Sequence, residues 1–187
     1  MKASGTVAAL AWLAAMMAAV PCRAQPPNEA ARFSDYAVKA AYLYKFASYV
    51  DWPEDLLDAA SPLRIGVLGA QDLAEELALI TSGRTVDGRS ITVTRLRSSD
   101  TVDDLHILFV GRDESGRLER LLAPARIRPI LTVTDSDDAL TAGSIINFIV
   151  SDERVRFEIS LFEAEQRGLR IDSRLLAVAQ GVFRAAE

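Results

Sequence analysis

Residues 63–83 read LRIGVLGAQDLAEELALITSG, an apolar run followed by a helical pattern. The run at 63–69 is almost entirely apolar, which predicts a strand buried on both faces of a sheet. Gly69 ends this strand, and the amphipathic helix predicted for 71–83 also stops at a glycine. A buried strand that leads directly into a helix is the repeating unit of an α/β fold.

The remainder of the chain supplies more units of this kind. Further strands are predicted at 89–96, 105–111, 129–135, 144–150 and 154–160. Further helices are predicted from Ser34 to about Val50, at about 114–122, at 162–168 and over 172–186, the last capped by Asp172 or Ser173. The strands at 144–150 and 154–160 face each other across SDE and form a hairpin. The sequence therefore predicts a three-layer α/β fold with a mostly parallel sheet, helices on both faces and an antiparallel hairpin at one edge.

The last strand of that hairpin, RVRFEIS (154–160), alternates apolar and charged residues. Alternate side chains of a strand point to opposite faces, so one face is expected to be buried. The predicted core face carries Val155, Phe157 and Ile159. The predicted surface face carries Arg154, Arg156 and Glu158.

The N-terminal stretch 1–24 has one lysine, then an uncharged apolar run over 7–20, then small residues. The run is shorter than the roughly 20 residues that cross a bilayer. We predict a signal peptide that is cleaved near Ala24, so that the mature protein is exported to the periplasm without membrane insertion. A retained anchor and a lipoprotein acylated at Cys22 are the alternatives. A short flexible segment at 25–33 follows.

One domain of residues 34–187 remains, long enough to bury a full core. The whole chain has 21 basic and 26 acidic residues, and loss of Lys2 and Arg23 with the leader makes the mature net charge −7. This acidity excludes binding to nucleic acid or anionic lipid through bulk charge. The only cysteine lies in the leader, so the mature protein has no disulfide and no thiol chemistry.

Motifs for catalysis or cofactor binding are scarce. His106 is the only histidine and lies in the apolar run LHILFV, which favours a structural role over a catalytic triad or a zinc site. Gly66 and Gly69 do not have the spacing of the dinucleotide fingerprint. We therefore predict no enzyme activity, no cofactor and no metal.

The carboxyl ends of the strands are the place where open α/β sheets bind ligands. Gln71, Arg112 and Asp135 follow three of the predicted strands and form a candidate site for a small polar ligand. A surface ion pair between Arg112 and Asp135 is the favoured alternative. A receiver-type phosphoacceptor site needs a lysine on a later strand. Both lysines of the mature chain, Lys39 and Lys45, lie in the first helix, so such a site at Asp135 is excluded.

That first helix includes the aromatic stretch KAAYLYKFASYVDWP (39–53). At 100° per residue its core face carries Tyr36, Ala40, Leu43, Phe46, Ala47 and Val50, with Tyr42 at the margin. The opposite face carries Ala37, Ala41, Tyr44, Lys45 and Ser48. Small residues around a tyrosine suit a protein interface. We predict that this outward face meets a second chain, either another subunit or a receptor; coverage by another helix of the same chain is the equal alternative.

Several sequence blocks occur in an order that resembles the YfiR/HmsC family of periplasmic regulators. These blocks are VKAAYLYKFASYVDWP, LRIGVLG, GR before ITV, HILFV, LTVTD, RFEIS and GLRIDSRLLAVA, within about residues 35–183. The resemblance implies an α/β fold, usually dimeric, without catalytic activity. It also implies binding to the periplasmic sensor part of an inner-membrane diguanylate cyclase, which is held inactive. Sequestration by an outer-membrane lipoprotein would release the cyclase, raise cyclic di-GMP and promote biofilm growth.

The chain departs from this family at the cysteines. Better-known members have a cysteine pair near the hairpin and the block RFEIS, whereas this chain has none there. Disulfide-dependent switching is therefore excluded for this chain. The alternative function is a periplasmic small-ligand-binding module that serves another receptor or a transporter.

Overall fold

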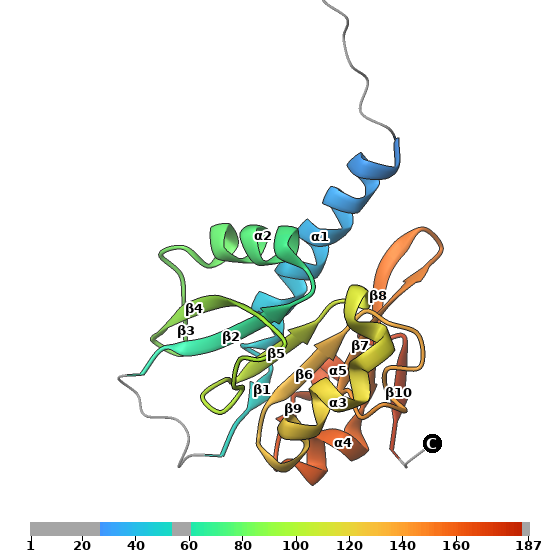
Figure 1. The fold of residues 1–187 in the computed structure, drawn as a ribbon. Helices are drawn as coiled ribbons and strands as arrows, with labels where there is room; N and C mark the ends of the chain where they lie inside the picture. The colour runs from blue at the N-terminus through green and yellow to red at the C-terminus, as the bar shows by residue number, and fades with distance from the viewer. Residues whose placement is uncertain (1–26, 54–60, 185–187) are drawn as a thin grey trace, which may run out of the picture.

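The computed structural model describes residues 27–53 and 61–184, with side chains from residue 35 onward (Figure 1). Its centre is an eight-stranded sheet with the order β10-β8-β7-β6-β5-β2-β4-β3. These strands are β2 (Leu63–Leu68), β3 (Thr85–Val86), β4 (Arg89–Leu96), β5 (Ile107–Val110), β6 (Leu131–Thr134), β7 (Ile146–Ser151), β8 (Arg154–Ser160) and β10 (Gly181–Phe183). A separate two-stranded sheet pairs β1 (Val50–Asp51) with β9 (Arg170–Ile171).

The helices are α1 (Pro27–Phe46), α2 (Gln71–Thr81), α3 (Leu118–Leu122), α4 (Leu161–Gln166) and α5 (Ser173–Leu176). Two 3₁₀ helices, η2 (Arg112–Arg117) and η3 (Ala123–Ile127), flank α3. The helix predicted at about 114–122 is therefore part 3₁₀ and part α-helical. Gly116 lies inside it, and glycine disfavours a continuous α-helix.

The strand directions confirm the predicted fold class. β4, β2, β5, β6 and β7 are neighbours and run parallel, whereas β7 and β8 form the predicted antiparallel hairpin. At the other edge β3 and β4 are antiparallel, joined by Asp87 and Gly88, whose φ angles are both positive. An Asp-Gly pair with positive φ favours a tight hairpin turn.

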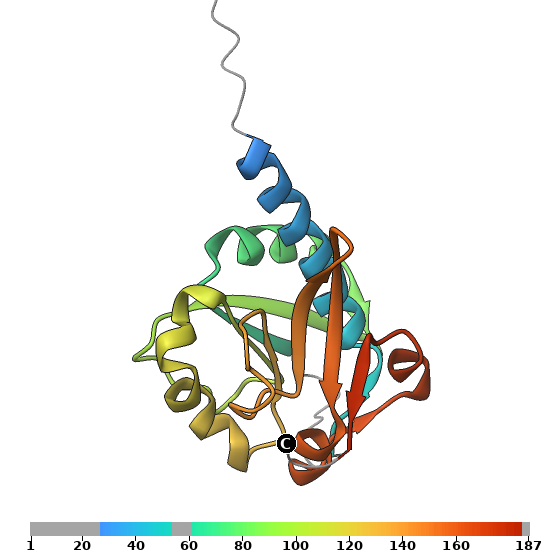
Figure 2. The same cartoon turned by 90° about the vertical axis from the view of Figure 1, so that its right-hand side faces the viewer.

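Two apolar layers lie on opposite faces of the sheet. The larger core joins α1 and α2 to residues such as Ile65 and Phe109, and α2 packs against α1 (Figures 1 and 2). The smaller core joins α3 to Leu68 and Leu108 on the other face. Alternation along the buried strands separates the two sets of side chains.

The core face predicted for α1 is confirmed. Ala40, Leu43, Phe46, Ala47 and Val50 are buried, while Tyr36 and Tyr42 are half-buried. Tyr42 and Phe46 pack against Phe148 and Phe157 with ring centroids 5.1–6.0 Å apart. Most aromatic side chains of this helix therefore serve ordinary packing.

The boundaries predicted for α1 are wrong at both ends. The helix begins at Pro27 rather than Ser34, inside the segment predicted to be flexible. Proline suits the first helical position because its fixed φ matches the helix and its missing N–H needs no partner there. The helix ends at Phe46, and Val50 instead pairs with Ile171 in the small sheet.

The long C-terminal helix predicted for 172–186 is also wrong. Asp172 caps α5 through the backbone N–H of Arg174, but α5 has only four residues. The chain then forms β10, which runs parallel to β8, with Gly181 opposite Glu158. Glycine ends helices, and the open edge of β8 supplies backbone partners for Val182 and Phe183.

The predicted signal peptide 1–24 and its cleavage site lie outside the described residues. Within 27–53 and 61–184 no helix is long and apolar enough to cross a membrane. The N-terminal half of α1 and the β7–β8 hairpin both project from the same end of the domain (Figures 1 and 2).

Candidate functional site

The carboxyl edge of the sheet brings the loops after β2 and β5 into contact. Gly111 donates its backbone N–H to Leu68 O at 2.8 Å. A Cβ atom added to Gly111 would lie 2.5 Å from Gly69 O, so this close approach requires glycine. Among the parallel strands, β2 comes first in the chain and lies between the second and third, β4 and β5. Sheets with this strand order bind ligands where the first and third strands meet, which here is the end of β2 and β5. In this chain the backbones of the two loops are in direct contact there.

A buried ion pair lies at the same edge, beyond β6. Lys39 Nζ lies 2.7 Å from Asp135 Oδ2, and the two side chains are 8% and 4% exposed. Arg112 donates from Nη2 to Asp135 O at 3.0 Å, and its Nε lies 4.0 Å from Asp135 Oδ2. Asp135 Oδ1 and the buried hydroxyl of Ser136 have no hydrogen-bond partner in the described part of the chain. The pair therefore fastens α1 to the end of β6.

Part of this arrangement is predictable from the sequence. Arg112 and Asp135 do meet, as the ion-pair alternative requires, but Asp135 is buried and its main partner is Lys39. Lys39 is not among the predicted site residues, although 100° per residue places it between Leu43 and Phe46 on the apolar face. A lysine on the core face of a helix is the signal that would have found the pair.

Gln71 lies apart from this pair, as the first residue of α2. It lines a cleft of about 790 Å³ together with Tyr36 and Arg95. None of the interactions in the described residues joins Gln71 to Arg112 or Asp135. The structure thus brings together two of the three residues that were predicted to bind a polar ligand.

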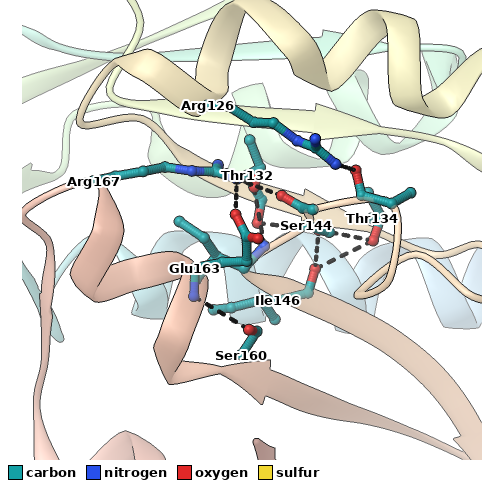
Figure 3. A network of polar contacts seen from close by, with 11 residues as sticks. Arg126, Thr132, Thr134, Ser144, Ile146, Ser160, Glu163 and Arg167 are labelled. Carbon is teal, nitrogen blue, oxygen red and sulfur yellow. Dashed lines mark hydrogen bonds and ion pairs between the residues drawn. The ribbon is translucent and has the colours of Figure 1, made fainter. Parts of the chain in front are cut away.

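A second buried polar network surrounds Arg167 (Figure 3). Arg167 donates to Thr132 Oγ1 at 2.9 Å and to Gly143 O, and it pairs with Glu163 at 2.8 Å. Its side chain is fully buried, and burial lowers the pKa of this guanidinium. The network joins β6, the loop before β7 and α4. The sequence does not reveal this network, because residues 132, 143 and 167 share no local pattern.

His106 lies in a third polar cluster, beneath Trp52. Its Nδ1 accepts the backbone N–H of Arg64 at 3.1 Å, and Arg89 Nη2 lies 3.1 Å from Nε2. The Trp52 ring meets the imidazole edge-on at 6.0 Å. Burial, followed by the Arg89 and Arg64 cations, lowers the pKa of His106 to about 4. The imidazole is therefore neutral at neutral pH and surrounded by donors.

We expect the folded protein to titrate His106 near pH 4. The unfolded histidine titrates near 6.5, so the unfolded chain binds a proton between these values that the folded chain does not. The free energy of unfolding should therefore fall by up to about 3 kcal/mol as the pH drops from 6.5 to 4. His106 is the only histidine, so proton NMR of its ring measures the midpoint directly.

A His106→Gln variant is the control for the pH dependence of stability. Carboxylates contribute equally to acid unfolding in both proteins, so the difference between their unfolding curves isolates the imidazole. An NMR midpoint near 6.5, or curves with the same pH dependence, would contradict the assigned environment.

The predicted outward face of α1 is open to solvent for most of its length. Ala41, Lys45 and Ser48 are exposed, and Ala37 is half-buried. Tyr44 is half-buried against the larger core, with the Arg84 guanidinium 5.5 Å from its ring centroid. The chain itself thus covers part of Tyr44, whereas the small residues remain accessible. Whether a second chain meets this face stays a prediction.

The chemistry of the described residues offers no obvious metal centre: no group of three or more His, Cys, Asp or Glu is placed to hold an ion. The paired Asp135 and the neutral His106 suit structural roles. Accessible features include the α1 face, with Ala41 and Ser48, and the cleft beside Gln71.

Comparison with known proteins gives a family match. A family model described as YfiR/HmsC-like matches residues 36–180. Among solved structures, a conserved domain protein from Vibrio cholerae O1 biovar El Tor has a TM-score of 0.51 and 15% sequence identity. The match covers 64% of this chain and 54% of that chain, so this chain accounts for about half of that protein. At such identity the likeness concerns the fold alone. No curated protein sequence matches.

Proposed function

The chain belongs to the YfiR/HmsC-like family, a regulatory family, and we propose that it is a non-enzymatic periplasmic regulator. In this proposal it binds the periplasmic sensor part of an inner-membrane diguanylate cyclase and represses the synthesis of cyclic di-GMP. An outer-membrane lipoprotein that sequesters it would relieve the repression and promote biofilm growth. The protein acts as a homodimer in this scheme.

The observation that carries the proposal is the family match over residues 36–180, which spans nearly all of the described domain. The site chemistry is compatible with it. Asp135 is held by Lys39, and His106, with a pKa near 4, is a poor general base at neutral pH. The leader predicted for 1–24 supports a periplasmic location.

We propose the outward face of α1 as the surface that meets the cyclase or the second subunit. Ala41 and Ser48 are exposed, and Val38 is 39% exposed beside them. Small side chains let another backbone or helix approach closely. Tyr44 adds an aromatic group at the inner margin of this face.

An Ala41→Glu variant should bind its partner at least about tenfold more weakly, a loss of about 1.4 kcal/mol. The new carboxylate would be desolvated without a partner at the centre of the contact. Affinity is measured by pull-down and sedimentation with membrane extract of the native host, and cyclic di-GMP should rise in cells that carry the variant. The folded state should be unaffected because position 41 is exposed.

The matched control is Thr92→Glu, an exposed position on β4 that lies away from α1. A photo-crosslinking amino acid at position 41, but not at 92, should capture the partner. Identification of a diguanylate cyclase by mass spectrometry supports the proposal. Capture of another receptor, or unchanged binding by Ala41→Glu, would count against it.

The second candidate is a periplasmic small-ligand-binding module that serves a different receptor or transporter. The cleft of about 790 Å³ beside Gln71 favours it, since ligands gather at the carboxyl edge of open α/β sheets. Neighbouring genes discriminate between the two: a membrane cyclase with a periplasmic sensor domain supports the regulator.

A further inference from the structure

A second cavity opens on the face of the sheet away from α1. It has a volume of about 380 Å³ and lies between the β4–β5 connection and the α3–η3 segment. Its floor is formed by the ends of β2 and β4, Leu68 and Leu96, together with Leu108 of β5. Val102 and Leu121 form its walls. All five side chains belong to, or pack against, the smaller core, so the cavity is an open continuation of that core.

The cavity exists because the second helical layer is incomplete. This layer consists of α3 and η3, which contribute Leu118, Leu122 and Ala125 to the smaller core. Over β2 no helix of the described chain lies on this face, and Leu96 and Leu105 cover Gly66 instead. A Cβ atom added to Gly66 would lie 2.6 Å from a methyl group of each leucine. The sheet end next to these leucines is left with an apolar surface and only a loop above it.

The rim of the cavity holds two guanidinium groups and two carboxylates. Arg97 and Arg120 line it, both are exposed, and neither guanidinium has an ion pair or hydrogen bond in the described part of the chain. The two acidic residues of the rim already have donors: Asp103 pairs with Arg128 at 2.8 Å, and Asp100 accepts the backbone N–H of Arg97 at 2.8 Å. Two unpaired guanidinium groups therefore stand beside an apolar floor in a protein that is acidic overall.

We propose that this cavity binds a small amphiphilic carboxylate, with its apolar body on the leucine floor and its head group at Arg97 and Arg120. The volume lies in the range of small-molecule sites. A planar guanidinium matches a carboxylate through two parallel hydrogen bonds, which favours this head group over an alcohol or an ammonium. The inference goes beyond the proposed function, since the cavity and α1 lie on opposite faces and the ligand does not depend on the partner.

The test uses octanoate as the probe and octanol as its uncharged counterpart, with the full mature chain. Isothermal titration should give a dissociation constant for octanoate below about 1 mM and weaker binding of octanol. NMR shifts should concentrate at Leu96, Val102 and Leu121. The Arg97→Gln/Arg120→Gln variant should bind octanoate at least tenfold more weakly, with octanol binding unchanged.

Two further variants keep the result interpretable. Arg154→Gln removes an exposed arginine on the β7–β8 hairpin and should bind octanoate like the unmodified protein. Thr101→Trp, at an exposed position that lines this cavity but not the cleft beside Gln71, should block both probes by filling the cavity. Octanoate binding weaker than about 1 mM, equal affinity of the double variant, or tighter binding of octanol would overturn the proposal. Tighter binding of octyl phosphate than of octanoate would overturn the carboxylate head group in favour of a phosphate.

Discussion

Truncation of Phe157 to alanine is expected to lower the free energy of unfolding by about 3–5 kcal/mol. Phe157 is 1% exposed, and its ring meets Phe46 edge-on at 5.1 Å and Tyr42 at 5.3 Å. The substitution leaves a cavity where α1 packs on β8 and removes two edge-to-face contacts. Urea unfolding followed by circular dichroism measures the loss, which appears as a lower midpoint with an unchanged slope.

Arg156→Ala is the matched control, one residue earlier on the same strand. Its side chain is on the opposite face of β8 and half-buried, so the expected change is within about 0.5 kcal/mol. Equal losses for both variants would mean that β8 is sensitive to any substitution. An unchanged midpoint for Phe157→Ala would mean that the ring is not part of the core.

The strands and helices that carry one buried face could be predicted from the sequence. In β8 the burial of Val155, Phe157 and Ile159 follows from alternation, and in α1 the buried face follows from the helical period. These patterns are local and strongly repeated, so they survive without knowledge of the tertiary structure. The predicted parallel sheet rests on the same patterns.

Elements decided by distant partners could not be predicted. Residues 177–183 favour a helix up to Gly181, yet β10 forms because the edge of β8 lies within reach. The pair of β1 with β9 joins Val50 to Ile171, and no local feature marks either two-residue strand. Short strands of this kind are stabilised by their partner rather than by their own composition.

The candidate site could be predicted only in part, because its residues are also distant from one another in the sequence. The position of Arg112 and Asp135 at strand ends follows from the topology, but Lys39 is 96 residues away from Asp135 in the chain. Burial of a lysine and a carboxylate is favourable only as a pair. Each residue alone therefore gives a misleading local signal, and the pairing emerges only when α1 is placed against β6.

The second large effect is expected for Asp135→Leu, which should lower the free energy of unfolding by about 3–5 kcal/mol. The substitution leaves the ammonium group of Lys39 buried without its carboxylate partner, at a position where the pair is 8% and 4% exposed. Lys39→Met should cost less, because Arg112, 4.0 Å from the carboxylate, still lies beside Asp135. Urea unfolding of both variants measures this asymmetry.

The double variant Lys39→Met/Asp135→Leu tests whether the pair acts as a unit. Replacement of a buried ion pair by apolar residues of similar volume is often neutral, so the double variant should be more stable than Asp135→Leu alone. Arg112→Gln, which changes the exposed neighbour, should have a small effect. If the losses of the single variants simply add, α1 is held by its apolar face alone. A positive coupling would identify the ion pair as the contact that fixes the base of α1, and with it the orientation of the exposed face around Ala41.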